Sequence, residues 1–291
     1  SALDAGVTSV MASFNSINGS KIHGDKSILD DLLRNQLGFE GFTIGDWNGH
    51  GQVPGCTNES CAQAINAGMD MVMVPEDWKA LLLNTVAQVE SGVSSEGRID
   101  EAVRRILMAK MKAGLFDAPM PSAKAVPLQA NLGSEEHRIV AREAVRKSMV
   151  LLKNNGSVLP ISGSAEVLVA GSGANSIEMQ TGGWTITWQG TGNSNETFPG
   201  ATSIYAAIDQ ALTGMGGSAT LSVDGSYTKR PDVAVVVFGE TPYAEGQGDV
   251  DNLAWQQEDP RDLRLLQQLQ SEGVPVVAVL LTGRPLWMNA E

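Results

Sequence analysis

Apolar residues along the chain fall into short continuous runs and into stripes of helical spacing. The apolar, β-branched runs predict buried strands at residues 7–14, 42–45, 69–74, 167–170, 234–238 and 276–281. Stripes with apolar positions three and four residues apart predict helices at residues 26–37, 60–67, 77–91, 98–113, 201–212 and 263–269, together with a long helix that starts after Ser134. Strands that alternate with helices form parallel βα units, so the predicted fold class is α/β.

A segment rich in proline and alanine, residues 117–133, lacks helical periodicity and is predicted to link two domains. Residues 1–116 contain about three predicted strands, whereas a closed barrel needs eight. We therefore expect residues 1–116 to be the C-terminal part of a (β/α)8-type barrel and residues 134–291 to be a second α/β domain. Because the chain starts without methionine and ends just after a predicted strand, we also expect it to be a piece of a longer protein.

The charge and hydropathy of the chain exclude some classes of partner. The net charge is −13 at pH 7, which would repel the phosphates of nucleic acid, so no nucleic-acid partner is predicted. No apolar run reaches the roughly 18 residues of a membrane-spanning helix, so no membrane span is predicted. Composition alone suits a soluble protein that binds neutral ligands.

The two cysteines of the chain, Cys56 and Cys61, lie close together in the segment CTNESC. In an exported protein they would form a small loop disulfide, and the alternatives are two reduced thiols or half of a metal site. The three histidines, at positions 23, 50 and 137, show no ligand spacing relative to each other or to the cysteines. We therefore predict no metal, and nothing in the sequence calls for a cofactor.

The strongest chemical signal is the segment FEGFTIGDWNGH, residues 39–50. Asp46 and Trp47 follow directly on the predicted strand 42–45, after the release of the chain at Gly45. A carboxylate can attack or stabilise an anomeric carbon, and an indole offers a flat apolar face to a pyranose ring. The alternative is an aspartate that caps the next helix beside a core tryptophan.

A second group of carboxylates follows the predicted strand 234–238, in the flexible segment GETPYAEGQGD. Loops at the carboxyl ends of strands are where α/β sheets bind ligands, and a glycosidase needs a second carboxyl group opposite the first. The candidates are Glu240, Glu245 and Asp249. The alternative is a solvated acidic loop without a catalytic role.

Two further segments carry glycines. The segment GGWTITWQG, residues 182–190, places Trp184 and Trp188 between glycines, which favours an exposed turn over ordinary core aromatics. The segment GSGAN, residues 171–175, resembles the start of a dinucleotide-binding fingerprint, but Ser176 occupies the place of the third glycine. We interpret it as a sharp turn.

Taken together, these segments resemble glycoside hydrolase family 3, in its branch of exo-acting β-glucan glucohydrolases and β-glucosidases. The resemblance covers nearly the whole chain and rests on the order and spacing of MASFNSING, LGFEGFTIGDW, AGMDMVMVP, RIDEAVRRILMAKMKAGLF, AREAVRKSMVLLKN, VAGSGAN, GGWTITWQG and GETPYAEGQGD. It implies a barrel domain followed by an α/β sandwich domain, with no cofactor. It also implies a secreted or periplasmic protein, in keeping with the cysteine pair.

The resemblance assigns two catalytic roles. Asp46 occupies the place of the family's nucleophile, and Glu245 the place of the acid/base on the loop of the sandwich domain. A retaining enzyme would use the pair to release glucose from the non-reducing ends of a β-glucan or β-glucoside, through a covalent glycosyl-enzyme. The family's early barrel strands supply further sugar-binding residues that this chain lacks, so we expect weak or no turnover from the chain by itself.

For substrate binding, the resemblance assigns Trp47 and Trp184 to a clamp around the second sugar, and Phe14 and Met11 to the sugar site. Phe14 stands where the family often has a tyrosine, which removes one hydrogen bond that could position Asp46. Two alternatives remain open. One is a family member with another substrate, a β-xylosidase or β-N-acetylglucosaminidase, and the other is a glycan-binding protein without turnover.

Overall fold

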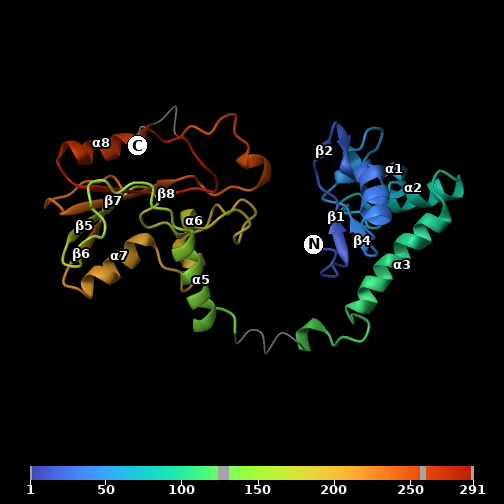
Figure 1. Cartoon of the computed structure of the whole chain (residues 1–291), viewed down its shortest axis with the longest axis horizontal. Helices are drawn as coiled ribbons and strands as arrows, with labels where there is room; N and C mark the ends of the chain where they lie inside the picture. Colours follow the sequence, from blue (N-terminus) through green and yellow to red (C-terminus); the bar gives the residue numbers. More distant parts are fainter. Residues whose placement is uncertain (1, 124–130, 256–259, 290–291) are drawn as a thin grey trace. The chain divides into compact units, whose positions relative to one another are not determined.

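The computed structural model describes residues 2–123, 131–255 and 260–289 (Figure 1). The chain forms two compact units, Ser1–Glu143 (unit 1) and Ala144–Glu291 (unit 2). The division falls inside helix α5 (Glu135–Ser148), which Ser134 caps by accepting a hydrogen bond from the amide of His137. Within the predicted linker, residues 124–130 lie outside the described residues. The domain limits at residues 116 and 134 therefore stay predictions.

Unit 1 contains a pair of parallel strands, β1 (Ser9–Met11) and β4 (Phe42–Ile44), in which Met11 lies opposite Ile44. The strand predicted at residues 69–74 is wrong, because this segment makes only an isolated bridge from Met71 to Ile44. A side chain interrupts the ladder at this point: the carboxylate of Asp70, and not a main-chain carbonyl, accepts the amide hydrogen of Thr43. A short hairpin, β2 (Ser16–Ile17) with β3 (Ser20–Lys21), lies between β1 and β4 along the chain.

Four helices of unit 1 agree with the helical stripes of the sequence within a few residues: η2 (Ser27–Gln36, of the wide π type), α1 (Ala62–Asn66), α2 (Trp78–Glu90) and α3 (Glu96–Lys112). The short helical turns η1 (Ile22–Gly24) and η3 (Gly49–Gln52) were not predicted. The hydroxyl of Ser95 caps α3 by accepting from the amide of Arg98, and Gly114 ends it with a positive φ that suits glycine. Their buried core consists of Ala12, Ile22, Leu29, Val53, Cys61, Ala64, Ala67 and Met69.

A buried carboxylate joins β4 to the helices of unit 1. The side chain of Asp70 is 0% exposed and forms ion pairs with Arg34 from η2 and with Arg98 and Arg105 from α3. The distances to Arg98 and Arg105 are 2.7 and 3.1 Å. Because Asp70 also accepts the amide of Thr43, this cluster fixes the strand that leads to Asp46.

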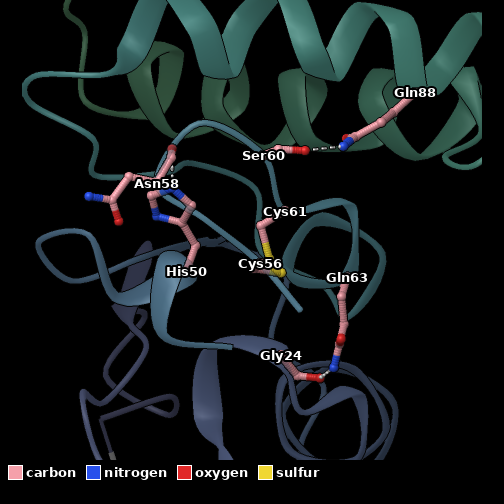
Figure 2. Close-up of a disulfide and its surroundings, with 8 residues drawn as sticks. All are labelled: Gly24, His50, Cys56, Asn58, Ser60, Cys61, Gln63 and Gln88. Carbon is pink, nitrogen blue, oxygen red and sulfur yellow. Dashed lines mark hydrogen bonds between the residues drawn. A yellow bond between two sulfur atoms is a disulfide. The ribbon is translucent and has the colours of Figure 1, made fainter. Parts of the chain in front are cut away.

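The cysteine pair forms a disulfide, with Cα atoms 4.8 Å apart (Figure 2). The bridge closes the short loop 56–61, and this loop contacts neighbouring elements on two sides. The Asn58 carbonyl contacts Nε2 of His50 at 2.8 Å, and the hydroxyl of Ser60 accepts from Gln88 on α2. The disulfide thus fixes the surroundings of η3, the first helical turn after Asp46.

Unit 2 is built on a four-stranded parallel sheet with the order β6-β5-β7-β8. Its strands are β5 (Glu166–Ala170), β6 (Ser218–Leu221), β7 (Val233–Gly239) and β8 (Val276–Leu281). Figure 1 shows α7 (Ile204–Thr213) and α8 (Arg261–Ser271) on opposite faces of this sheet. Apolar side chains alternate between the two faces, as in β7, where Val235 and Val237 belong to the cluster with α7 and Val236 and Phe238 to the cluster with α8.

The strand order of unit 2 reverses direction at the centre of the sheet. The chain runs from β5 outward to β6, then returns past β5 to β7 and β8. Loops at such a switch point leave the sheet in opposite directions and open a ligand-binding crevice at the carboxyl ends of the strands. The loops that start there are 171–176 after β5, with a sharp turn at Gly171, and 240–249 after β7. The first leads to the short helix α6 (Ile177–Gln180).

Candidate active site

Asp46 lies at the carboxyl end of β4, in the turn that leads to η3. Two successive amides of this turn are committed to specific partners. The amide of Asp46 donates to Nε2 of His23 at 2.8 Å, and the amide of Trp47 donates to the Asp46 carboxylate oxygen Oδ1 at 2.6 Å. The backbone and one carboxylate oxygen of Asp46 are therefore held, and in the part of unit 1 that the structure describes no hydrogen bond reaches Oδ2.

The ring of His23 is fully buried beneath this turn. Burial lowers the pKa of His23, and the charges of His50 and Lys21 lower it further against the opposing effect of Asp46. A neutral imidazole can accept at Nε2 only if its proton is on Nδ1. The hydrogen bond to Asp46 thus selects one tautomer of a neutral histidine.

The aromatic and apolar candidates of unit 1 lie at the same end of the strand pair. Trp47 is 55% exposed, and Met11, paired with Ile44 in the register of β1 and β4, is exposed at the end of β1. Phe14 is partly exposed, and its ring packs edge-on against His23 with centroids 6.1 Å apart. The structure therefore brings Asp46, Trp47, Phe14 and Met11 to the carboxyl end of one parallel pair.

Glu245 lies at the start of η5 (Glu245–Gly248), in the loop that follows β7. Its backbone is in the left-handed region, with φ 51°, which is uncommon for a residue other than glycine. The exposed carboxylate accepts a hydrogen bond at Oε2 from the indole Nε1 of Trp188, at 2.9 Å. A charged acceptor bonded to an indole donor is one of the stronger side-chain contacts.

The structure separates the three candidate carboxylates of this loop. Glu240 forms an ion pair with Arg284, at 3.0 Å, and accepts from the hydroxyl of Thr282 at 2.7 Å. These contacts tie the start of the loop to the segment after β8. Glu245 projects from the loop and is exposed, and Asp249 is exposed at the end of η5. Glu240 thus serves the loop's structure, whereas Glu245 and Asp249 are exposed. Of these two, Glu245 is the one whose carboxylate accepts from an indole.

The loop of the two tryptophans packs against the loop of Glu245. The side-chain oxygen of Gln189 accepts from the amide of Ala244 at 2.7 Å, one residue before Glu245. Gly183 lies so close to Tyr243 that a Cβ in its place would stand 2.3 Å from the Tyr243 carbonyl oxygen. Only glycine allows this approach, so the two loops act as one structural element.

Trp184 and Trp188 lie in ring contact, with centroids 6.2 Å apart, and both are exposed. The stretch is a loop, with positive φ at Trp184 and Ile186, in agreement with the exposed turn expected from the sequence. Trp188 is the residue of this loop whose indole donates to Glu245. The assignment of Trp184 to the sugar clamp stays a prediction.

Two residues of the candidate site carry no assignment from the sequence. His23 enters the sequence reasoning only through metal spacing, and Trp188 only as the partner of Trp184. A signal for Trp188 does exist, since its indole lies in the same glycine-flanked loop as Trp184. No comparable signal marks His23.

Each unit therefore presents a carboxylate beside an exposed indole, Asp46 with Trp47 and Glu245 with Trp188, in a loop that follows a parallel strand. Glycoside hydrolases typically act with a pair of carboxyl groups, and exposed aromatic side chains beside them can stack on sugar rings. Comparison with known protein families agrees: residues 1–109 match the glycosyl hydrolase family 3 N-terminal domain and residues 149–291 match the glycosyl hydrolase family 3 C-terminal domain. The chain belongs to glycosyl hydrolase family 3.

Several relatives are similar over almost the whole chain. The crystal structure of an exo-1,3/1,4-β-glucanase from a Pseudoalteromonas species is 56% identical, with a TM-score of 0.95 over 99% of this chain and 36% of that one. A lysosomal β-glucosidase of Dictyostelium discoideum is 33% identical over 97% of this chain and 36% of its own length. A periplasmic β-glucosidase of Salmonella typhimurium is 30% identical, over 99% and 41%. The chain thus spans less than half the length of these relatives.

The structure also bears on the predictions about membranes and metals. Among the described residues, no helix combines the length and the apolar character needed to cross a bilayer. The same residues contain no cluster of three or more histidine, cysteine, aspartate or glutamate side chains arranged to hold a metal ion.

Proposed function

We propose that this chain carries both catalytic carboxylates of a retaining, exo-acting β-glucosidase or β-glucan glucohydrolase, with Asp46 as the nucleophile and Glu245 as the acid/base. The observation that carries the proposal is the 56% identity, over 99% of the chain, to an exo-1,3/1,4-β-glucanase. The geometry supports it, because Asp46 lies at the carboxyl end of β4 beside the exposed Trp47, and the exposed carboxylate of Glu245 accepts from the indole of Trp188.

The chemistry follows from these roles. Oδ2 of Asp46 attacks the anomeric carbon and displaces the leaving oxygen, which Glu245 protonates. Glu245 then removes a proton from water, and the water oxygen displaces Asp46 and releases glucose with retained configuration. Retaining enzymes hold the two carboxyl groups about 5–5.5 Å apart when they act on one bond. The indoles of Trp47 and Trp184 provide apolar faces for the second sugar.

The wider assignments belong to the same proposal. We propose that residues 1–116 are the late part of a (β/α)8-type barrel and that the protein is exported. The parallel pair of β1 with β4 supports the first, and the Cys56–Cys61 disulfide supports the second, because disulfides persist in oxidising compartments. The substrate is a β-glucan or β-glucoside.

The test is covalent trapping in the protein expressed from its complete gene. The protein is incubated with 2-deoxy-2-fluoro-β-glucosyl fluoride, and the labelled peptide is mapped by mass spectrometry. We expect the label on Asp46, and we expect Asp46→Asn to lower kcat by at least about 10³-fold, a loss of about 4 kcal/mol in transition-state stabilisation. The control is Asp30→Asn, which removes a partly exposed carboxylate on η2.

Three outcomes would overturn the proposal. A label on another carboxylate would remove Asp46 as the nucleophile. Faster labelling by the corresponding xylosyl or 2-acetamido reagent would replace the glucosyl substrate. Calorimetric binding of laminaribiose by a folded protein that forms no product and takes no label would indicate a glycan-binding protein without turnover.

A further inference from the structure

The amide of Asp46 has a partner that is unusual for a strand end, a histidine ring from a separate element. His23 lies in η1, and its Nε2 accepts the Asp46 amide at 2.8 Å across 23 positions of sequence. The ring is 0% exposed, so no water can replace this acceptor without rearrangement. The position of the Asp46 backbone therefore depends directly on the position of the ring.

Close packing fixes the ring beneath the turn. A Cβ added to Gly49 would stand 2.3 Å from Nε2 of His23, and a Cβ added to Gly45 would stand 3.4 Å from its Cδ2. The turn from Gly45 to Gly49 thus lies directly on the imidazole, with Phe14 against the ring from the side. The absence of side chains at both glycines lets the backbone approach this closely.

The second amide of the turn, that of Trp47, has a different acceptor from the amide of Asp46. The Trp47 amide donates to Oδ1 of Asp46, while the Asp46 amide is committed to His23. One carboxylate oxygen is therefore held by the turn, and the turn is held by the ring. Rotation of the turn would move Oδ2, the oxygen proposed to attack, away from the anomeric carbon.

We propose that His23 is a positioning residue for Asp46, which in its neutral form holds the turn so that the carboxylate is aimed for attack; this inference rests on the proposed function. Protonation of His23 would remove the acceptor and place an N–H against the amide of Asp46. The rate constant for attack by Asp46 should therefore fall as the pH is lowered and His23 becomes protonated. The charged groups that act on this ring are Asp46 itself, His50 from η3 and Lys21 from the end of β3.

The experiment compares His23→Gln with His23→Asn in the protein expressed from its complete gene. Both variants carry the same amide group, but only the longer glutamine can place its oxygen near the position of Nε2. The readout is the rate constant for labelling of Asp46 by 2-deoxy-2-fluoro-β-glucosyl fluoride. Fluoride leaves with the electron pair of the broken C–F bond as the Asp46 oxygen bonds to C1, so this step needs no proton from Glu245.

We expect His23→Asn to lower the labelling rate constant by about 10²-fold, as a displacement of about 1 Å can do, and His23→Gln to stay within about tenfold of wild type. Reagent binding, measured by saturation, should change less than about threefold in either variant. The matched control is His50→Gln, which alters another buried histidine, bonded to the Asn58 carbonyl and not to Asp46. Its labelling rate constant should lie within about threefold of the wild-type value.

A pH series separates positioning from a merely structural role. The wild-type labelling rate should fall at acid pH with one ionisation that is missing from His23→Gln, because an amide does not titrate. If wild type labels on Asp46 but the two variants label at equal rates, or if His23→Gln shows the same acid limb as wild type, the inference is overturned while the proposed function stands. If wild type does not label on Asp46, the proposed function itself fails.

Discussion

At the residue scale, each proposed catalytic residue has a partner that sets its geometry. His23 accepts from the amide of Asp46, and Trp188 donates to the carboxylate of Glu245. The two contacts differ in kind. The first holds a backbone, whereas the second touches the oxygen that must carry a proton to the leaving group.

Replacement of Trp188 by phenylalanine should impair proton donation selectively. The variant keeps an aromatic ring but loses the Nε1 donor to Glu245. We expect kcat/KM to fall about tenfold for an alkyl β-glucoside, whose leaving group needs a proton, and to change little for 2,4-dinitrophenyl β-glucoside, whose leaving group does not. Steady-state kinetics with both substrates checks this.

The control for this prediction is Trp184→Phe, which alters the neighbouring indole of the same loop. Because Trp184 makes no described hydrogen bond to Glu245, its loss should change kcat/KM by a similar factor for both substrates. Equal sensitivity of the two leaving groups in Trp188→Phe would contradict the assignment of the donor.

Stability should depend on pH through His23. Its pKa in the folded protein lies below the ordinary value of 6.5, so at slightly acidic pH the unfolded state binds a proton that the folded state does not. The contribution of neutral His23 is therefore complete above pH 6.5 and declines as the pH falls below it. The free energy of unfolding should drop more between about pH 7.5 and 5.5 in wild type than in His23→Gln. Equal drops in the free energy of unfolding of wild type and His23→Gln would show that His23 does not contribute to this pH dependence.

The site residues illustrate what sequence can and cannot supply. Asp46, Trp47 and the group of Glu240, Glu245 and Asp249 could be located because they follow predicted strands, and the family resemblance singled out Glu245. The contacts of His23 and Trp188 bridge 23 and 57 positions and depend on how turns pack, which no local pattern encodes. The ion pair of Glu240 with Arg284 likewise became visible only in the structure.

At the element scale, the Asp70 cluster connects β4 to η2 and α3 through one carboxylate. It also explains the wrong strand prediction at 69–74, since the apolar alternation there is genuine but the Asp70 side chain takes the ladder bond of Thr43. The short strand β6 was missed for the opposite reason: it is a sheet edge of only four residues without an apolar run. Hydrophobic periodicity therefore located β5, β7 and the edge strand β8, which are apolar runs, but not the short and partly polar edge strand β6.

Replacement of Asp70 by asparagine should destabilise unit 1 strongly. Three arginines would lose their shared buried carboxylate, and removal of one partner from a buried ion pair costs about 3–5 kcal/mol. Urea unfolding of wild type and variant measures the difference. Asp30→Asn, which removes a partly exposed partner of Lys26, should cost less than about 1 kcal/mol. A similar small loss in both variants would show that the cluster does not bear on stability.

The disulfide belongs to the same scale because it anchors the loop that contacts η3 (Figure 2). Closure of so short a loop restricts the unfolded chain by an amount worth about 2 kcal/mol. The double variant Cys56→Ser, Cys61→Ser should therefore lose about that much stability, measured by urea unfolding without reductant. Addition of reductant should destabilise wild type and leave the double variant unchanged, and a response of the double variant would point to another cause.

At the scale of the whole molecule, the two compact units have separate cores. Units with separate cores unfold as separate transitions unless strong contacts couple them. Scanning calorimetry should therefore resolve at least two transitions. Asp70→Asn should lower one, and Leu269→Ala, which empties a fully buried position against the sheet of unit 2, should destabilise another by about 2–5 kcal/mol. A shift of all transitions by either variant would show that the units unfold together.

The division of the two proposed catalytic carboxylates between these units has a consequence for how the protein loses activity on unfolding. Under the proposed mechanism, bond cleavage needs both Asp46 and Glu245, so activity would survive only while both units are folded. Heat or denaturant would abolish this activity at the unfolding midpoint of the less stable unit, although the more stable unit would still be folded. A search for variants that stay active longer should therefore begin by finding which unit unfolds first. Stabilising the other unit would not prolong the activity.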